Sequence, residues 1–129
     1  MQMTFLRPWA PQILSLIRIV TAAAFLTHGL IKLVGWPAPF PYPMNGLLYV
    51  AAIMEIVGGV LLIVGLLSRP VAFLLSGQMA AAYFMAHASQ GFFPALNMGE
   101  PAMLFCFIFL YIAAAGPGPW SLDALRNAD

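Results

Sequence analysis

Long apolar stretches divide the chain, and short segments rich in proline and glycine separate them. Apolar runs of this length indicate helices rather than strands. The connections are short, which favours antiparallel neighbours. The pattern predicts an all-α fold, a four-helix up-down-up-down bundle formed by residues 1–129 as one domain. The expected helices cover residues 12–34, 46–67, 70–93 and 98–115, followed by a short interfacial turn at 121–126.

A polar stripe runs along the first expected helix. At 1.5 Å per residue this helix is about 35 Å long, enough to cross a bilayer with some tilt. A charge that faces lipid costs several kcal/mol, so the other helices should cover the stripe. Its members are spaced alternately four and three residues apart, which places them on one helix face: Leu14, Arg18, Thr21, Phe25, His28 and Lys32.

Composition supports a membrane setting. The chain is 63% hydrophobic and only 7% charged, with a mean hydropathy of +0.94, whereas soluble domains carry roughly 25% charged residues. This predicts an integral membrane protein, and a net charge of +1 gives no indication of a nucleic-acid partner. The single cysteine, Cys106, excludes a disulfide or a C-x-x-C redox motif within the chain. Arg18 interrupts the first apolar stretch, which favours an uncleaved helix over a signal peptide.

Basic residues predict the orientation. Arg7, Arg69 and Arg126 belong to one end of the expected bundle, and Lys32 lies just inside the other end. Because positively charged loops stay in the cytoplasm, both termini are expected there.

Polar residues also occur in the later helices. Glu55 is the one charge in the second helix, and Gly58 and Gly59 share its face, where another helix can approach closely. In the third helix Gln78 is expected on the face opposite to a second polar stripe, which comprises Ser76, Ala80, Tyr83, His87 and Gln90.

Counting the rise along each helix places these side chains by depth. His28 and His87 each lie about 9 Å below the outer ends of their helices. They are expected to form an outer-half cluster with Lys32, Glu100 and Tyr83, above an Arg18–Glu55 pair. Five of these residues have a plainer interpretation: Arg18 and Glu55 only neutralise each other, Lys32 extends to the lipid headgroups, Glu100 caps the last helix and His87 is a packed histidine.

The cluster suits a quinone, which has a flat ring with two carbonyl acceptors and an apolar tail. Glu55, His28 and His87 are the candidate catalytic residues, since they can donate or pass protons. The candidate substrate-binding residues are Arg18, Lys32, Tyr83 and Glu100. The two histidines could instead ligate a b-type haem, but equal depth does not make their rings face each other, and haem is not expected. No carboxylate lies at ligand spacing on the same helix as either histidine, and no metal site is expected.

Several motifs resemble the DoxX family of small four-helix membrane proteins. They are Arg18, HGLIK at 28–32, EIVGGVLLIVGLLSRP at 55–70, NMGE at 97–100 and SLDAL at 121–125. The NMGE segment departs from the family's glycine-rich form at Met98. The resemblance implies a bacterial or archaeal protein of the cytoplasmic (inner) membrane. Some members are linked to quinone-dependent redox chemistry, and many have no established activity.

Two main functions follow, and a third is weaker. The first is a subunit or accessory of a quinone-linked oxidoreductase system; because no flavin motif or cysteine cluster occurs, electrons would come from a partner protein or a bound reductant. The alternative is a non-catalytic membrane scaffold that recruits or assembles partner proteins. The weaker hypothesis is a carrier for a small acidic or quinone-like solute. Lipid, a quinone, and a partner protein or second copy of the chain are the expected partners.

Overall fold

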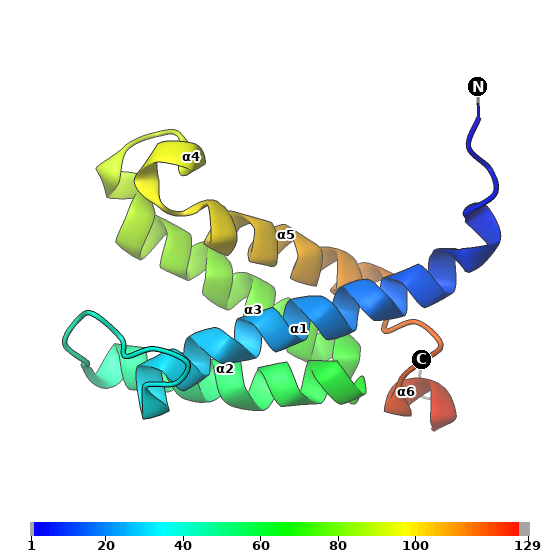
Figure 1. Ribbon diagram of the computed structural model, residues 1–129, viewed down its shortest axis with the longest axis horizontal. Coiled ribbons are helices and arrows are strands. Elements are labelled where there is room, and N and C mark those ends of the chain that lie inside the picture. The colour runs from blue at the N-terminus through cyan, green and yellow to red at the C-terminus, as the bar shows by residue number, and fades with distance from the viewer. Residues whose placement is uncertain (1, 127–129) are drawn as a thin grey trace.

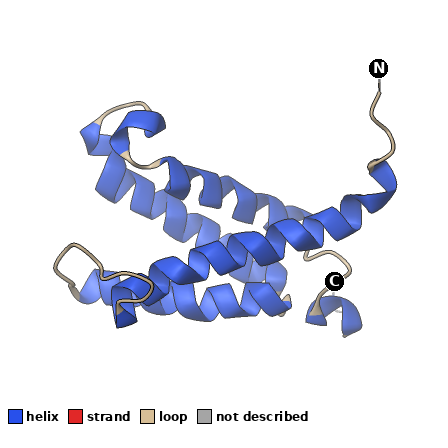
Figure 2. Ribbon diagram, viewed as in Figure 1, coloured by secondary structure: helices blue, strands red, loops and turns tan. Residues whose placement is uncertain are grey.

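The computed structural model describes residues 2–126, and within that range every regular element is helical (Figure 2). The main helices are α1 (Ala10–Val34), α2 (Gly46–Val64), α3 (Ser68–Ala82) and α5 (Glu100–Ala115). Three helical stretches are long and apolar enough to cross a membrane, and α5 is apolar but shorter. The predicted all-α class is therefore confirmed, and the composition is that of a membrane protein.

The main helices form two packed pairs. Helix α1 lies along α2, and α3 lies along α5. Figure 1 shows the pairs diverging toward the side where the 35–45 loop and the short helix α4 (Pro94–Asn97) lie, here called the loop end. They cross at the other side, the turn end, which carries the α2–α3 turn and the short C-terminal helix α6 (Leu122–Leu125).

The first two helices begin and end for identifiable local reasons. Helix α1 starts at Ala10, two residues earlier than predicted, with Pro11 in its first turn, where the missing N–H is not needed. The side chain of Asn45 accepts a hydrogen bond from the Leu48 N–H and caps α2. Helix α2 ends at Val64 rather than residue 67, because Gly65 adopts a left-handed conformation with φ of 74°.

The third helix changes its winding near the loop end. After Ala82 the chain forms a π-helical turn over Tyr83–His87 and a 3-10 turn over Ala88–Gln90. The predicted continuation to residue 93 is therefore wrong by three residues. A π-helical turn widens the helix by one residue per turn and is frequent at functional sites.

The fourth predicted helix is divided. Residues 94–97 form α4, and α5 begins at Glu100 with Pro101 in its first turn. The helix predicted for residues 98–115 therefore begins two residues later than predicted, with Gly99 directly before it. Asn97 does not cap α5; its side-chain oxygen accepts from the Gly99 N–H instead.

Aromatic residues form the centre of the core. Phe25 of α1 is buried and meets Phe105 and Phe109 of α5 edge-on, with ring centroids 5.3 and 4.9 Å away. The predicted close packing at Gly58 and Gly59 is confirmed. A Cβ at Gly58 would lie 2.8 Å from Leu75, and one at Gly59 would lie 3.1 Å from Leu26, so the pair admits α3 on one side and α1 on the other.

The C-terminal segment is hydrogen-bonded to the start of α3 at the turn end. Ser121 caps α6 by accepting from the Ala124 N–H. The two carboxylate oxygens of Asp123 accept from the backbone N–H groups of Leu67 and Ser68, at 2.9 and 2.8 Å. Asp123 therefore caps α3, whose first N–H groups have no partner within their own helix.

Loss of the Asp123 cap should lower stability in a pH-dependent way. Burial alone would raise the pKa of Asp123, but the hydrogen bonds from Ser68 and Leu67 hold this pKa below its ordinary value. The cap therefore contributes fully above the ordinary carboxyl pKa of about 4, and its contribution is lost as the pH falls through the lower folded pKa. Asp123→Asn replaces one of the two accepting oxygens by an amide nitrogen, and the lost hydrogen bond should cost about 1 kcal/mol at pH 7.

Thermal unfolding of the detergent-solubilised protein between pH 7 and pH 3 measures this effect. The difference between wild type and Asp123→Asn should shrink as the pH falls. Thr4→Ala, which changes an exposed side chain without an ionisable group, is the control. A difference that stays constant with pH would contradict the cap's role.

Candidate functional site

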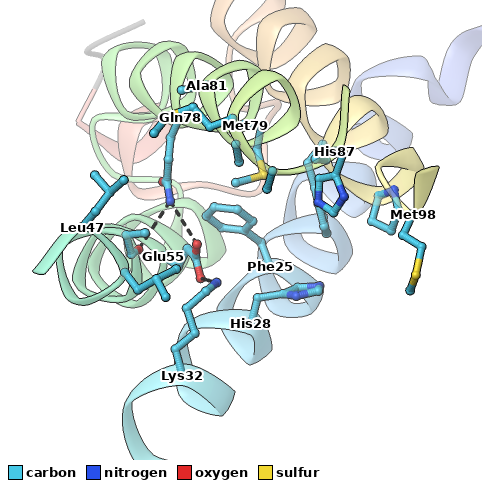
Figure 3. A pocket seen from close by; sticks show the side chains of 18 residues that line it. Phe25, His28, Lys32, Leu47, Glu55, Gln78, Met79, Ala81, His87 and Met98 are labelled. Carbon is cyan, nitrogen blue, oxygen red and sulfur yellow. Dashed lines mark hydrogen bonds and ion pairs between the residues drawn. The ribbon is translucent and has the colours of Figure 1, made fainter. Parts of the chain in front are cut away.

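A cavity of about 410 Å³ lies between the two helix pairs, within the size range of small-molecule sites. Figure 3 shows it from close by. Helix α1 contributes Phe25, His28 and Lys32. Helices α2, α3 and α5 supply further walls, and the π-helical turn after α3 and Met98 complete the lining. Most of the lining is apolar, and its polar side chains are His28, Lys32, Glu55, Gln78 and His87.

A hydrogen-bonded ion pair forms one polar side of the cavity. Lys32 Nζ lies 2.7 Å from Glu55 Oε1, and Gln78 Nε2 donates to Glu55 Oε2 at 3.0 Å (Figure 3). Glu55 is only 2% exposed, and the Lys32 side chain is 15% exposed. Both carboxylate oxygens are thus satisfied, as a buried charge requires.

The predicted Arg18–Glu55 pair is wrong. Arg18 is fully buried near the turn end, where its guanidinium donates to backbone carbonyls. Nε donates to Leu62 at 2.8 Å, Nη2 donates to Trp120 at 2.6 Å, and Nη1 donates to Pro117. Helix C-termini leave carbonyl oxygens unpaired, and arginine's several donors satisfy those of α2 and of the chain after α5 together. Arg18 does not line the cavity.

Lys32 has a buried partner in place of the lipid headgroups. Its position one helical turn after His28 lets it reach across to α2, where Glu55 lies. The interpretation that Lys32 only extends to the membrane surface is therefore wrong. Its ammonium also lies 5.8 Å from the centroid of the Phe40 ring, so that the 35–45 loop covers the pair.

The two histidines line the other side of the cavity. In Figure 3 the rings of His28 and His87 lie beyond Phe25 from the Glu55 carboxylate. The His28 ring meets Phe105 edge-on at 5.7 Å. His87 Nδ1 lies 3.1 Å from the backbone carbonyl oxygen of Asn97. The expectation that the two histidines share one site is thus met in position, since both line this cavity.

Tyr83 and Glu100 do not line the cavity. The Tyr83 hydroxyl accepts from Asn97 Nδ2 at 3.0 Å, so Tyr83 stabilises the segment around Asn97, next to the cavity-lining Met98. Asn97 is fully buried and also donates to the Gly91 carbonyl at 2.9 Å. Glu100 is exposed at the start of α5, where the helix dipole stabilises a carboxylate.

Gln78 and Met98 are site residues that the sequence reasoning missed. Gln78 was expected to face away from the polar stripe of its helix, yet that face meets α2 and Glu55. A polar side chain at mid-helix in a membrane protein was the available signal. Met98 lines the mouth of the cavity and has a positive φ of 63°. It occupies the position where the sequence departs from the glycine-rich form of the segment.

Within residues 2–126, no three His, Cys, Asp or Glu side chains gather closely enough to hold a metal ion together.

The family model of DoxX matches residues 13–88 of the chain, which is more than half of its length. This chain belongs to the DoxX family. A relative from Haemophilus influenzae, named only as an uncharacterized protein, is 42% identical over 132 residues. The alignment covers 94% of this chain and 96% of that relative. No solved structure matches the chain.

The matched region of this DoxX protein contains the motif at 55–70, and the structure assigns a physical role to its main positions. Glu55 forms the ion pair, Gly58 and Gly59 admit neighbouring helices, and Gly65 ends α2. Arg69 Nη1 donates to the Ala114 carbonyl at 2.6 Å, near the end of α5. The motif therefore combines one cavity residue with positions that allow close helix packing, end α2 and connect α3 to the end of α5.

Proposed function

We propose that this DoxX protein binds the headgroup of a quinone in the cavity between its helix pairs, as a membrane subunit of a quinone-linked oxidoreductase system. The cavity carries the proposal, because it combines a mostly apolar lining of suitable size with a few polar groups on two sides. Phe25 and Phe105 also line it and supply aromatic surface for a flat ring.

The opening of the cavity suits an amphipathic ligand. The helix pairs diverge toward the loop end (Figure 1), and exposed apolar side chains such as Met85 lie along the lining. In a bilayer this arrangement lets an isoprenoid tail extend into lipid while the headgroup stays between the helices. A lipid acyl chain alone would not use the polar groups of His28, His87 and the Lys32–Glu55 pair.

The polar groups of the cavity have separate roles in binding the headgroup. The Lys32–Glu55 pair carries no net charge, so it suits an uncharged headgroup, and the remaining N–H donors of Lys32 can reach a ligand oxygen. His28 and His87 supply hydrogen-bonding nitrogens across the cavity. Arg18, Tyr83 and Glu100 have no place in this site, since other contacts or solvent occupy them.

The membrane arrangement is part of the same proposal. The four main helices cross the cytoplasmic (inner) membrane antiparallel to one another, in up-down-up-down order, with both termini in the cytoplasm. Supporting this orientation, Figure 1 shows the start of α1 and the helix α6 on the side of the turn end. Arg69 lies in the first turn of α3 and Arg126 directly follows α6. The turn end therefore faces the cytoplasm and the cavity lies in the outer half of the membrane. Electrons reach the bound quinone from a partner protein.

Calorimetric titration of the purified protein with a decyl-tailed benzoquinone tests the proposal. Ala86→Phe places a ring in the cavity from an exposed lining position. The affinity of this variant for the quinone should therefore fall at least tenfold. Ala24→Phe adds the same ring to an exposed position of α1 that does not line the cavity, and its affinity should match wild type. Equal losses in both variants, or no binding to wild type, would reject the site.

A further inference from the structure

Among the described residues, one cavity-lining side chain, that of His87, keeps a hydrogen-bond acceptor without a donor. We infer that the site selects a ligand that carries hydroxyl donors, the reduced hydroquinone rather than the quinone. This inference rests on the proposed function and names the form of the ligand that the same site prefers.

The hydrogen bond from His87 fixes which nitrogen carries the proton. A carbonyl oxygen can only accept, so the contact between His87 Nδ1 and the Asn97 carbonyl requires a proton on Nδ1. In a neutral imidazole Nε2 then has no proton and presents a lone pair. Nε2 is therefore the nitrogen left to accept a hydrogen bond from a ligand.

Asn97 is well placed to hold this tautomer. Its side chain is fully buried, donates to Tyr83 and Gly91, and accepts from the Gly99 N–H at 2.8 Å. Its backbone carbonyl is consequently held in position toward His87. A Cβ at Gly99 would lie 2.8 Å from the His87 Cβ, so the segment packs directly against the imidazole-bearing turn.

The His87 acceptor discriminates between the two redox forms of a quinone. A carbonyl oxygen can accept from Lys32 but cannot donate to His87. A hydroxyl group can accept from Lys32 and also donate to His87, so the hydroquinone loses nothing at Lys32 and gains at His87. Sites built to hydrogen-bond a hydroxyl reject analogues that lack it, because their own polar groups stay unpaired.

Anaerobic calorimetric titration of wild-type protein with a decyl-tailed hydroquinone, its quinone and its dimethyl ether tests the inference. The hydroquinone should bind about tenfold more tightly than either other ligand, the effect of one net hydrogen bond. The dimethyl ether keeps the ring and tail but removes both donors, so this comparison needs no variant. The ratio should fall to about threefold or less in His87→Phe and stay unchanged in Gln90→Ala, which alters the same segment outside the cavity.

The outcomes separate the inference from the proposed function. Equal affinity for the three ligands, or tighter binding of the quinone, overturns the selectivity and leaves the quinone site in place. A full ratio in folded His87→Phe overturns the role of His87. If none of the three ligands binds wild type, both the proposed function and this inference fail.

Discussion

Replacing Arg18 with leucine is expected to remove about 3 kcal/mol or more from the free energy of unfolding. The guanidinium is fully buried and donates to the carbonyls of Leu62, Pro117 and Trp120. Leucine leaves these acceptors unpaired, and each buried unpaired group costs about 1–3 kcal/mol. The loss should appear as a lower unfolding midpoint in detergent, without any change in quinone affinity among molecules that remain folded.

Two further variants sharpen the Arg18 test. Arg18→Lys should recover little stability, because one ammonium cannot reproduce the spread donors of a guanidinium. Arg7→Leu removes an exposed arginine from the N-terminal segment and should leave the midpoint unchanged. A folded Arg18→Leu variant with wild-type stability would contradict the role of Arg18 at the turn end.

Breaking the Lys32–Glu55 pair is expected to have a comparable effect at the cavity. Glu55→Gln leaves the Lys32 ammonium without its counter-charge, and losing one partner of a buried pair costs about 3–5 kcal/mol. The double variant Lys32→Met with Glu55→Gln should recover part of that loss. A double-mutant cycle on unfolding midpoints should therefore give a coupling energy of about 1 kcal/mol or more.

The same cycle with Arg18 in place of Lys32 provides the control. Arg18 and Glu55 share no hydrogen bond among the described residues, so losses from Arg18→Leu and Glu55→Gln should add within about 0.5 kcal/mol. Additive behaviour of Lys32 with Glu55, or strong coupling of Arg18 with Glu55, would contradict the pairing seen in the structure.

The polar stripe of α1 shows how far sequence reasoning reaches. Spacing alone correctly placed Arg18, Phe25, His28 and Lys32 toward the other helices, because α-helical geometry is regular along one segment. Which residue across the interface each one meets depends on the relative shift and tilt of two helices. A shift of one turn moves a partner by about 5.4 Å, and Arg18 and Lys32 lie about 21 Å apart along α1, so counting the rise of single helices does not decide which of the two meets Glu55.

The loop end was harder to predict than the helices themselves. The sequence predicted one continuous third helix, yet Tyr83–His87 forms a π-helical turn and Asn97 organises the chain around it. These features depend on contacts between residues distant in the chain, such as that of His87 with Asn97. No local pattern encodes them, and they determine which His87 nitrogen is free. The same holds for Gln78, whose partner lies on another helix.

Photoaffinity labelling tests most directly whether a quinone occupies the cavity. An alkyl-tailed azidoquinone would be photolysed with the protein in lipid nanodiscs, and the adducts mapped by peptide mass spectrometry. The account predicts adducts on the lining residues Met79, Met85, Met98 and Phe105, lost in Ala86→Phe and upon competition with unlabelled quinone. Adducts confined to exposed residues outside the cavity, such as Val20, Phe73 and Leu74, would contradict it.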